Sequence, residues 1–129
     1  MSQPLTDRSP QLTAILLSAV GVQRAVRLLI DTGAEVSMIT QTILEELRSV
    51  PRGRRHIIEI SANGAEHDEH ALHINLLLTD GHAIDFRDFL VVSMADQPDG
   101  IDGLIGQDLL QDLVFVYDGP RGAFRLERG

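Results

Sequence analysis

The chain contains no cysteine and no lysine, and these absences exclude several kinds of protein. Without cysteine it has no disulfide framework, no thiolate zinc site and no cysteine nucleophile. With no lysine and a formal net charge of -8, it lacks the clustered cations that nucleic-acid phosphates require. Its one basic run, from Arg52 to Arg55, is short. We therefore expect no nucleic-acid partner.

Long hydrophobic runs and nucleotide-binding motifs are missing as well. The longest apolar run, residues 14–22, is broken by Ser18 and Gly21, and a membrane span needs roughly 20 apolar residues. The first eleven residues lack the basic start of a signal peptide. Neither the phosphate-binding Gly-x-x-x-x-Gly-Lys loop nor Gly-x-Gly-x-x-Gly occurs. We expect a soluble cytoplasmic protein with no membrane partner and no nucleotide chemistry.

The sequence fits one mostly β domain. At 129 residues it can bury about two thirds of its unfolded surface. Residues 1–11, which contain Pro4 and Pro10, predict a flexible N-terminal arm, and residues 12–129 predict the domain. Strand-like runs at residues 12–20 and 24–30 flank a turn at residues 21–23, which predicts a hairpin.

Further turn signals divide the rest of the chain into strands and two short helices. Asn63-Gly64 and Asp80-Gly81 lie between strand-like runs and predict two more hairpins. Thr42 and Glu45 have the spacing of a capping box, which predicts a helix to about residue 47. A second short helix is expected from residue 107, and a closing hairpin over residues 115–126.

The most informative stretch is Leu28-Leu29-Ile30-Asp31-Thr32-Gly33-Ala34. Three apolar residues predict a buried strand end, and Thr32-Gly33 predicts a tight turn that leaves Asp31 poorly hydrated. A carboxylate in such a place indicates paired groups or chemistry, and the alternative is a turn aspartate that caps the next helix.

Catalysis by Asp31 requires a second acid, because one carboxylate cannot be general base and general acid in the same step. The chain holds no second Asp-Thr-Gly or Asp-Ser-Gly. A two-fold homodimer would place the same residue of both subunits at the axis, where two Asp31 side chains could share one proton.

Two other sites were considered. His67, His70 and His73 suggest a metal site, but on a strand they alternate between faces and spread over roughly 20 Å, so the pattern favours a solvated, pH-sensitive arm. Ser37 or Ser61 could be a nucleophile with a histidine partner, yet neither lies in a Gly-x-Ser-x-Gly elbow.

Three segments together resemble the retropepsin-like aspartic proteases of retroviruses and their cellular and bacterial relatives. They are residues 29–39 (LIDTGAEVSMI), the hairpin centred on Asn63-Gly64, and residues 104–110 (LIGQDLL). The resemblance covers about residues 12–126. It implies a closed β-barrel with one or two short helices, one lobe per chain, that dimerises and closes a flap over a peptide.

The resemblance also implies roles for particular residues. Asp31 would be the catalytic acid, Thr32 would brace the paired loops across the axis, and Gly33 would let the substrate backbone approach. Ala34 and Glu35 would line the cleft. The flap tip would consist of Ala62, Asn63, Gly64 and Ala65. Behind the loop would pack Leu104, Ile105 and Gly106. No metal or cofactor is implied.

Two departures from the viral pattern are visible. Viral enzymes usually carry arginine where this chain has Gln107, so a salt bridge from that position to Glu35 cannot form. The chain also ends in a hairpin instead of one interface strand. The sequence therefore predicts a homodimeric aspartic endopeptidase, and the alternative is a catalytically silent retropepsin-like module that binds peptides or dimerises.

Overall fold

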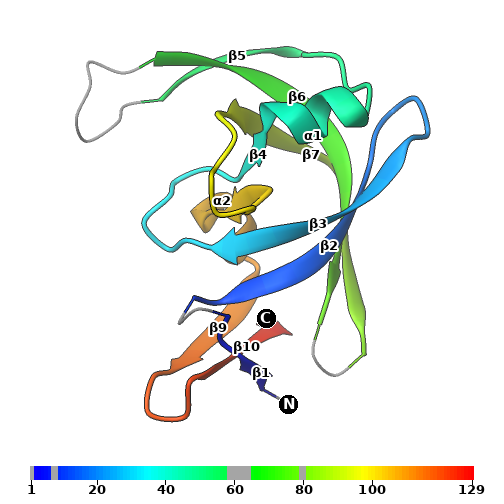
Figure 1. Ribbon diagram of the computed structural model, residues 1–129. Coiled ribbons are helices and arrows are strands. Elements are labelled where there is room, and N and C mark those ends of the chain that lie inside the picture. Colours follow the sequence, from blue (N-terminus) through cyan, green and yellow to red (C-terminus); the bar gives the residue numbers. More distant parts are fainter. Residues whose placement is uncertain (1, 7–8, 58–64, 79–80) are drawn as a thin grey trace.

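The computed structural model describes residues 2–6, 9–57, 65–78 and 81–129 and shows a mostly β molecule with two short helices (Figure 1). In chain order the elements are β1 (Gln3–Pro4), β2 (Gln11–Leu17), β3 (Gln23–Ile30), β4 (Met38–Thr40), α1 (Gln41–Glu46), β5 (Gly53–Ile57), β6 (Ala65–Leu77), β7 (Ala83–Met94), β8 (Gly103–Ile105), α2 (Gln107–Leu110), β9 (Leu113–Asp118) and β10 (Ala123–Arg128). Neither described helix is long and apolar enough to cross a membrane.

Six strands form a closed barrel in the order β2-β3-β8-β4-β7-β6. The barrel closes because β6 also pairs with β2, in the register Ala14 opposite Leu76 and Leu16 opposite Ile74. β5 extends the sheet beyond β6 and stays outside the closed ring. The predicted fold, a closed β-barrel with short helices, is therefore confirmed.

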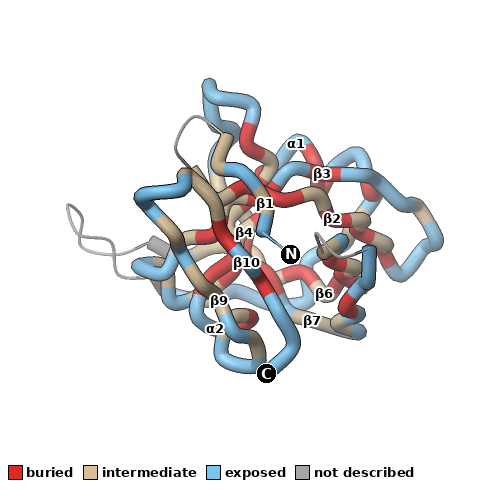
Figure 2. The backbone as a smooth tube through the Cα atoms, turned by 90° about the horizontal axis from the view of Figure 1, so that it is seen from below, coloured by how far each residue is buried: buried red, intermediate tan, exposed pale blue. Residues whose placement is uncertain are grey.

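Period-two alternation places the apolar side chains inside this barrel. Leu12, Ala14 and Leu16 of β2 are almost completely buried, and so are Val26 and Leu28 of β3. Successive strand residues face opposite sides, so each strand contributes one apolar face to the same core. Figure 2 shows these buried stretches on the inner strands, with the exposed segments around them.

A second sheet, ordered β1-β10-β9, lies at the end of the molecule that carries both termini (Figure 1). Gln3 of β1 pairs with Phe124 of β10, and the Leu5 N–H donates to the Gly122 carbonyl. Regular structure thus begins earlier than the predicted start at Leu12. The sequence of residues 1–11 is polar and contains proline, so it does not indicate a strand. β1 forms because it pairs with β10, which is far away in the sequence.

Helix α1 is present, but the predicted capping box is wrong. The N-cap residue is Thr40, and it makes no side-chain cap bond. Instead the Asp96 carboxylate accepts the Thr42 N–H at 3.2 Å and also the Thr42 hydroxyl. These hydrogen bonds hold the pKa of Asp96 below its usual value. The acid comes from a residue beyond β7, which a local sequence pattern cannot indicate.

The hairpin strands agree with the turn signals. β2 and β3 pair antiparallel around Gly21, whose φ of +87° favours glycine. β5 and β6 pair from Gly53 opposite Glu69 to Ile57 opposite Ala65, and this hairpin projects from the barrel (Figure 1). The Asn63-Gly64 turn and Asp80 lie outside the described residues. β9 and β10 form the expected closing hairpin.

Candidate active site

Asp31 directly follows β3, and the sheet fixes where it lies. β3 runs parallel to β8, with Leu29 opposite Leu104 and Ile30 opposite Ile105. The Asp31 N–H continues this ladder by donating to the Ile105 carbonyl at 2.9 Å. The end of a buried strand therefore delivers the acid to a defined place at the edge of the barrel.

Two further hydrogen bonds shape the turn after Asp31. Its Oδ1 accepts the Gly33 N–H at 3.0 Å, and its carbonyl accepts the Ala34 N–H at 3.1 Å. Asp31 is half-buried, while Thr32 and Gly33 are exposed. The Asp31 residue is thus partly shielded from water in the single chain. The helix-cap alternative is wrong, because α1 begins at Gln41 and the Thr42 N–H in its first turn donates to Asp96.

The start of α2 supports the turn from behind. The Gln107 N–H donates to the Ala34 carbonyl at 2.8 Å, and the Asp108 N–H donates to the Glu35 carbonyl at 3.2 Å. The Gln107 side chain donates from Nε2 to the Thr32 carbonyl at 2.8 Å. Gln107 therefore contacts the Asp31 turn through both its backbone and its side chain.

Gly106 is required by the close approach of two backbones. A Cβ atom there would lie 2.6 Å from both the carbonyl carbon and the oxygen of Val36 and 2.9 Å from the Ala34 oxygen. Ile105 beside it is fully buried, and Leu104 is half-buried. The segment Leu104, Ile105 and Gly106 therefore contacts the strand end and the turn that carry Asp31.

Ser37 and Asp108 form a buried link that the sequence analysis missed. The Ser37 hydroxyl donates to the Asp108 carboxylate at 2.8 Å and accepts the Gly106 N–H at 3.0 Å. The Ser37 N–H also donates to this carboxylate, at 3.0 Å. The 2% exposed Ser37 is thus a structural residue, not a nucleophile. The signal in the sequence was an acid, Asp108, in the first turn of a helix. Its partner Ser37 lies 71 residues away, so a local pattern does not indicate the pair.

The remaining predicted site residues are only partly placed. Ala34 is half-buried and Glu35 is exposed, both next to the Asp31 turn. Ala65 is the first residue of β6. The other three flap residues, Ala62, Asn63 and Gly64, lie outside the described residues, as does Ser61. The structure thus brings the turn and its support together, and the flap contacts stay a prediction.

The three histidines of β6 have separate partners. His67 Nδ1 pairs with the Ser93 carbonyl at 3.0 Å, His70 Nδ1 with the Ser49 hydroxyl at 2.7 Å, and His73 Nε2 with Asp85 at 3.0 Å. Within the described ranges no three ligating side chains could hold one ion. The predicted solvated arm is wrong for His70, because that ring faces inward and is 2% exposed.

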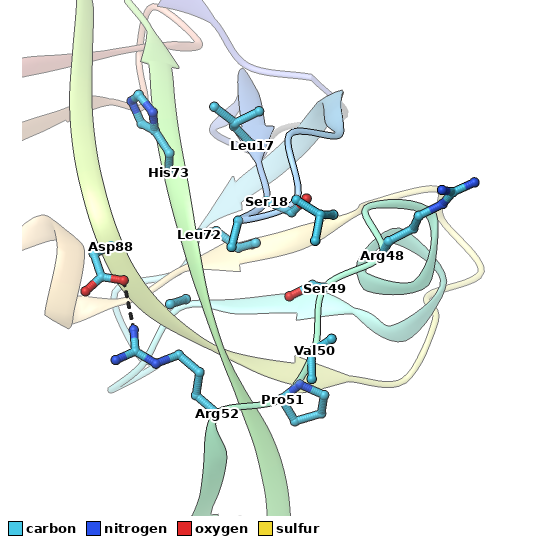
Figure 3. Close-up of a pocket in the computed structure, with 13 residues that line it drawn as sticks. Leu17, Ser18, Arg48, Ser49, Val50, Pro51, Arg52, Leu72, His73 and Asp88 are labelled. Atoms are coloured by element: carbon cyan, nitrogen blue, oxygen red, sulfur yellow. Dashed lines mark hydrogen bonds and ion pairs between the residues drawn. The ribbon is translucent and has the colours of Figure 1, made fainter.

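A cavity of about 540 Å³ lies away from this turn (Figure 3). It is bounded by the β2–β3 turn, by residues 48–52 and by parts of β6 and β7, and the Arg52–Asp88 ion pair crosses one side. None of the predicted site residues lines it. A second cavity, of about 460 Å³, does reach the turn, since Thr32 and Gln107 are among its lining residues.

The closed barrel, the turn at the end of β3 and the glycine that follows β8 define a protein with the retropepsin-like fold. The retropepsin-like aspartic protease from Rickettsia conorii has a similar structure, with a TM-score of 0.64 and 17% identity over 99% of this chain and 89% of that one. The retroviral protease-like domain of Ddi1 from Leishmania major is also similar, with a TM-score of 0.51 and 17% identity over 92% and 94%.

Sequence comparison identifies the family. The model of the gag-polyprotein putative aspartyl proteases matches residues 20–112, and the chain belongs to this family of retropepsin-like aspartyl proteases. The matched segment contains both the Asp31 turn and the support from β8 and α2. No curated protein sequence matches the chain significantly.

Proposed function

We propose that this protein is an aspartic endopeptidase that hydrolyses peptide bonds as a homodimer. The observation that carries the proposal is the geometry of the turn in a chain of this family: Asp31 Oδ1 is held by the Gly33 N–H at 3.0 Å, in a turn whose Thr32 and Gly33 are exposed. A half-buried, backbone-fixed acid beside an exposed turn suits a site that a second subunit completes.

In the proposed mechanism the two Asp31 carboxyls share one proton. Like charges about 3 Å apart cannot both ionise easily, so one carboxyl is ionised and its partner is protonated. The ionised group takes a proton from a water molecule, and this water attacks the carbonyl carbon while the protonated group donates to the carbonyl oxygen. The tetrahedral intermediate then collapses as the C–N bond breaks and the leaving amine takes a proton.

The first test compares Asp31→Asn with Asp112→Asn. Both substitutions remove one carboxylate, and Asp112 is an exposed acid close to α2. Peptide-library cleavage read by mass spectrometry, from about pH 3.5 to 7 across the carboxyl range, should show activity for the wild type and Asp112→Asn only. Cleavage by Asp31→Asn would refute the proposal, and peptide binding without turnover by the wild type would favour the silent module.

Subunit mixing tests whether the two Asp31 carboxyls of a dimer act together. When wild-type chains are mixed with Asp31→Asn chains and allowed to exchange, an active dimer needs two wild-type subunits. Activity should therefore fall as the square of the wild-type fraction, to about a quarter at equal mixing. Sedimentation on the same mixtures shows whether dimers form, and a linear fall would mean that each chain acts alone.

A further inference from the structure

Gln107 contacts the catalytic turn at two carbonyl groups on either side of Gly33. Its backbone N–H donates to the Ala34 carbonyl, and its side-chain Nε2 donates to the Thr32 carbonyl, each at 2.8 Å. The first bond is available to any residue except proline, whereas the second needs a side-chain donor of this length. The side chain thus has a contact of its own with the turn.

The Thr32 carbonyl belongs to the same peptide unit as the Gly33 N–H. A peptide unit is planar, so a hydrogen bond that fixes its C=O also fixes the direction of its N–H. That N–H is the group that donates to Asp31 Oδ1 at 3.0 Å. A continuous path of hydrogen bonds therefore runs from the Gln107 amide through one rigid peptide to the Asp31 carboxylate.

We propose that Gln107 is a positioning residue that orients the Asp31 carboxylate through the Thr32–Gly33 peptide, which rests on the proposed catalytic role of Asp31. In the single chain the Thr32–Gly33 peptide is exposed, so loss of the side-chain bond leaves it freer to rotate. Rotation would turn the Gly33 N–H away from Asp31 and allow the carboxylate more than one orientation.

The test compares Gln107→Leu and Gln107→Glu with Gln111→Leu. Gln111 also lies beside Thr32 and Leu110 at the end of α2, and its side chain makes no bond to the turn, so it is a matched control. Gln107→Leu should lower kcat by about 3- to 10-fold, as expected for one lost hydrogen bond, while KM changes by less than about twofold. Gln111→Leu should keep the wild-type kcat.

The Gln107→Glu variant should show a pH dependence of kcat that a purely structural role of Gln107 would not produce. An ionised carboxylate cannot donate to the Thr32 carbonyl, whereas a protonated carboxyl can. The kcat of this variant, relative to the wild type at the same pH, should rise as the pH falls below about 4.3, the ordinary carboxyl range. The relative kcat of Gln107→Leu should stay constant.

Amide exchange separates this inference from the proposed function. In an Asp31→Asn background the side-chain oxygen still accepts the Gly33 N–H, and no turnover is needed. Adding Gln107→Leu should speed exchange of the Gly33 amide by about 3- to 10-fold, and adding Gln111→Leu should not. Equal exchange in the two double variants would overturn the positioning role. A wild-type chain that cleaves no peptide would refute only the proposed function.

Discussion

The loop that carries Asp31 and the root of the β5–β6 hairpin are held by different kinds of interaction. The bonds from β8 and α2 to the Asp31 loop join uncharged groups: the Asp31 N–H to the Ile105 carbonyl, and the Gln107 N–H and side-chain amide to the carbonyls of Ala34 and Thr32. A glycine packed against backbone adds a steric constraint at the same place. Charge enters this support through the half-buried Asp108 carboxylate, which accepts the hydroxyl and the N–H of Ser37.

The hairpin root depends on side chains that titrate or carry charge. His70 of β6 pairs with Ser49, in the segment between α1 and β5. Ion pairs flank it: Arg52 with Asp88 at 2.8 Å and Arg55 with Glu69 at 2.9 Å. Exposed ion pairs weaken with salt, and a buried imidazole responds to pH. We therefore expect pH and salt to act on the hairpin before they act on the Asp31 loop.

The largest expected effect is that of Gly106→Ala, which disrupts the packing behind the Asp31 loop. The new methyl group would lie 2.6 Å from backbone atoms of Val36 and 2.9 Å from the Ala34 oxygen, and backbone cannot move aside as the end of a flexible side chain can. Overpacking of this kind costs about 3 kcal/mol or more of unfolding free energy. Urea unfolding followed by circular dichroism would measure the loss.

Gly53→Ala is the matched control from the hairpin. The nearest atom to a Cβ at Gly53 is the Glu69 Oε1 at 4.0 Å, which is ordinary contact, and Gly53 does not have a positive φ. The free energy of unfolding of this variant should lie within about 0.5 kcal/mol of the wild-type value. Equal losses for the two variants would show that the contact behind the Asp31 loop is not the constraint described here.

The two regions also differ in how far the sequence predicts them. The order of apolar residues and turns indicates the barrel strands, because alternation and Asx-Gly or glycine turns are local signals. The same holds for Asp31-Thr32-Gly33 and for the glycine after Ile105. The residues that the pattern missed, Ser37 with Asp108 and Thr42 with Asp96, are paired over 71 and 54 residues.

Hydration of Asp31 shows a second limit of sequence analysis. Three apolar residues before the acid correctly indicate a strand that ends in the core, since Leu28 and Ile30 are buried. They do not indicate that the chain turns outward one residue later and leaves Asp31 half-buried. The reverse error occurs at His70, where polar neighbours suggest solvent and the strand places the ring inside.

The second prediction concerns pH and the hairpin root. Burial lowers the pKa of His70 from its ordinary value of 6.5, and the charge of Asp68 only partly opposes this. Ser49, which is hydrogen-bonded to the ring, and Val91, the cross-strand partner of His70, are uncharged. Below pH 6.5 the unfolded chain binds the proton more readily than the folded chain, so stability is full at higher pH and is lost as the pH falls.

His70→Gln should flatten this dependence. Between pH 7 and 5 the wild type should lose more unfolding free energy than the variant, by at most about 1.4 kcal/mol per pH unit, the limit for one proton. The exposed His56 of β5 provides the control, and His56→Gln should follow the wild-type curve. Parallel curves for the wild type and His70→Gln would show that the buried ring does not make the hairpin root sensitive to acid.

The smallest expected effect is that of Arg55→Gln on the hairpin. Arg55 and Glu69 pair at 2.9 Å with side chains 36% and 17% exposed, so the pair is only partly screened by water. Its loss should cost about 0.5 kcal/mol at low salt and almost nothing near 1 M NaCl, where the Debye length is about 3 Å. Amide exchange in β5 should report the loss and exchange at Gly33 should not. A salt-dependent change at Gly33 would mean that the charges of the hairpin also reach the loop of Asp31, and the two regions would then respond as one.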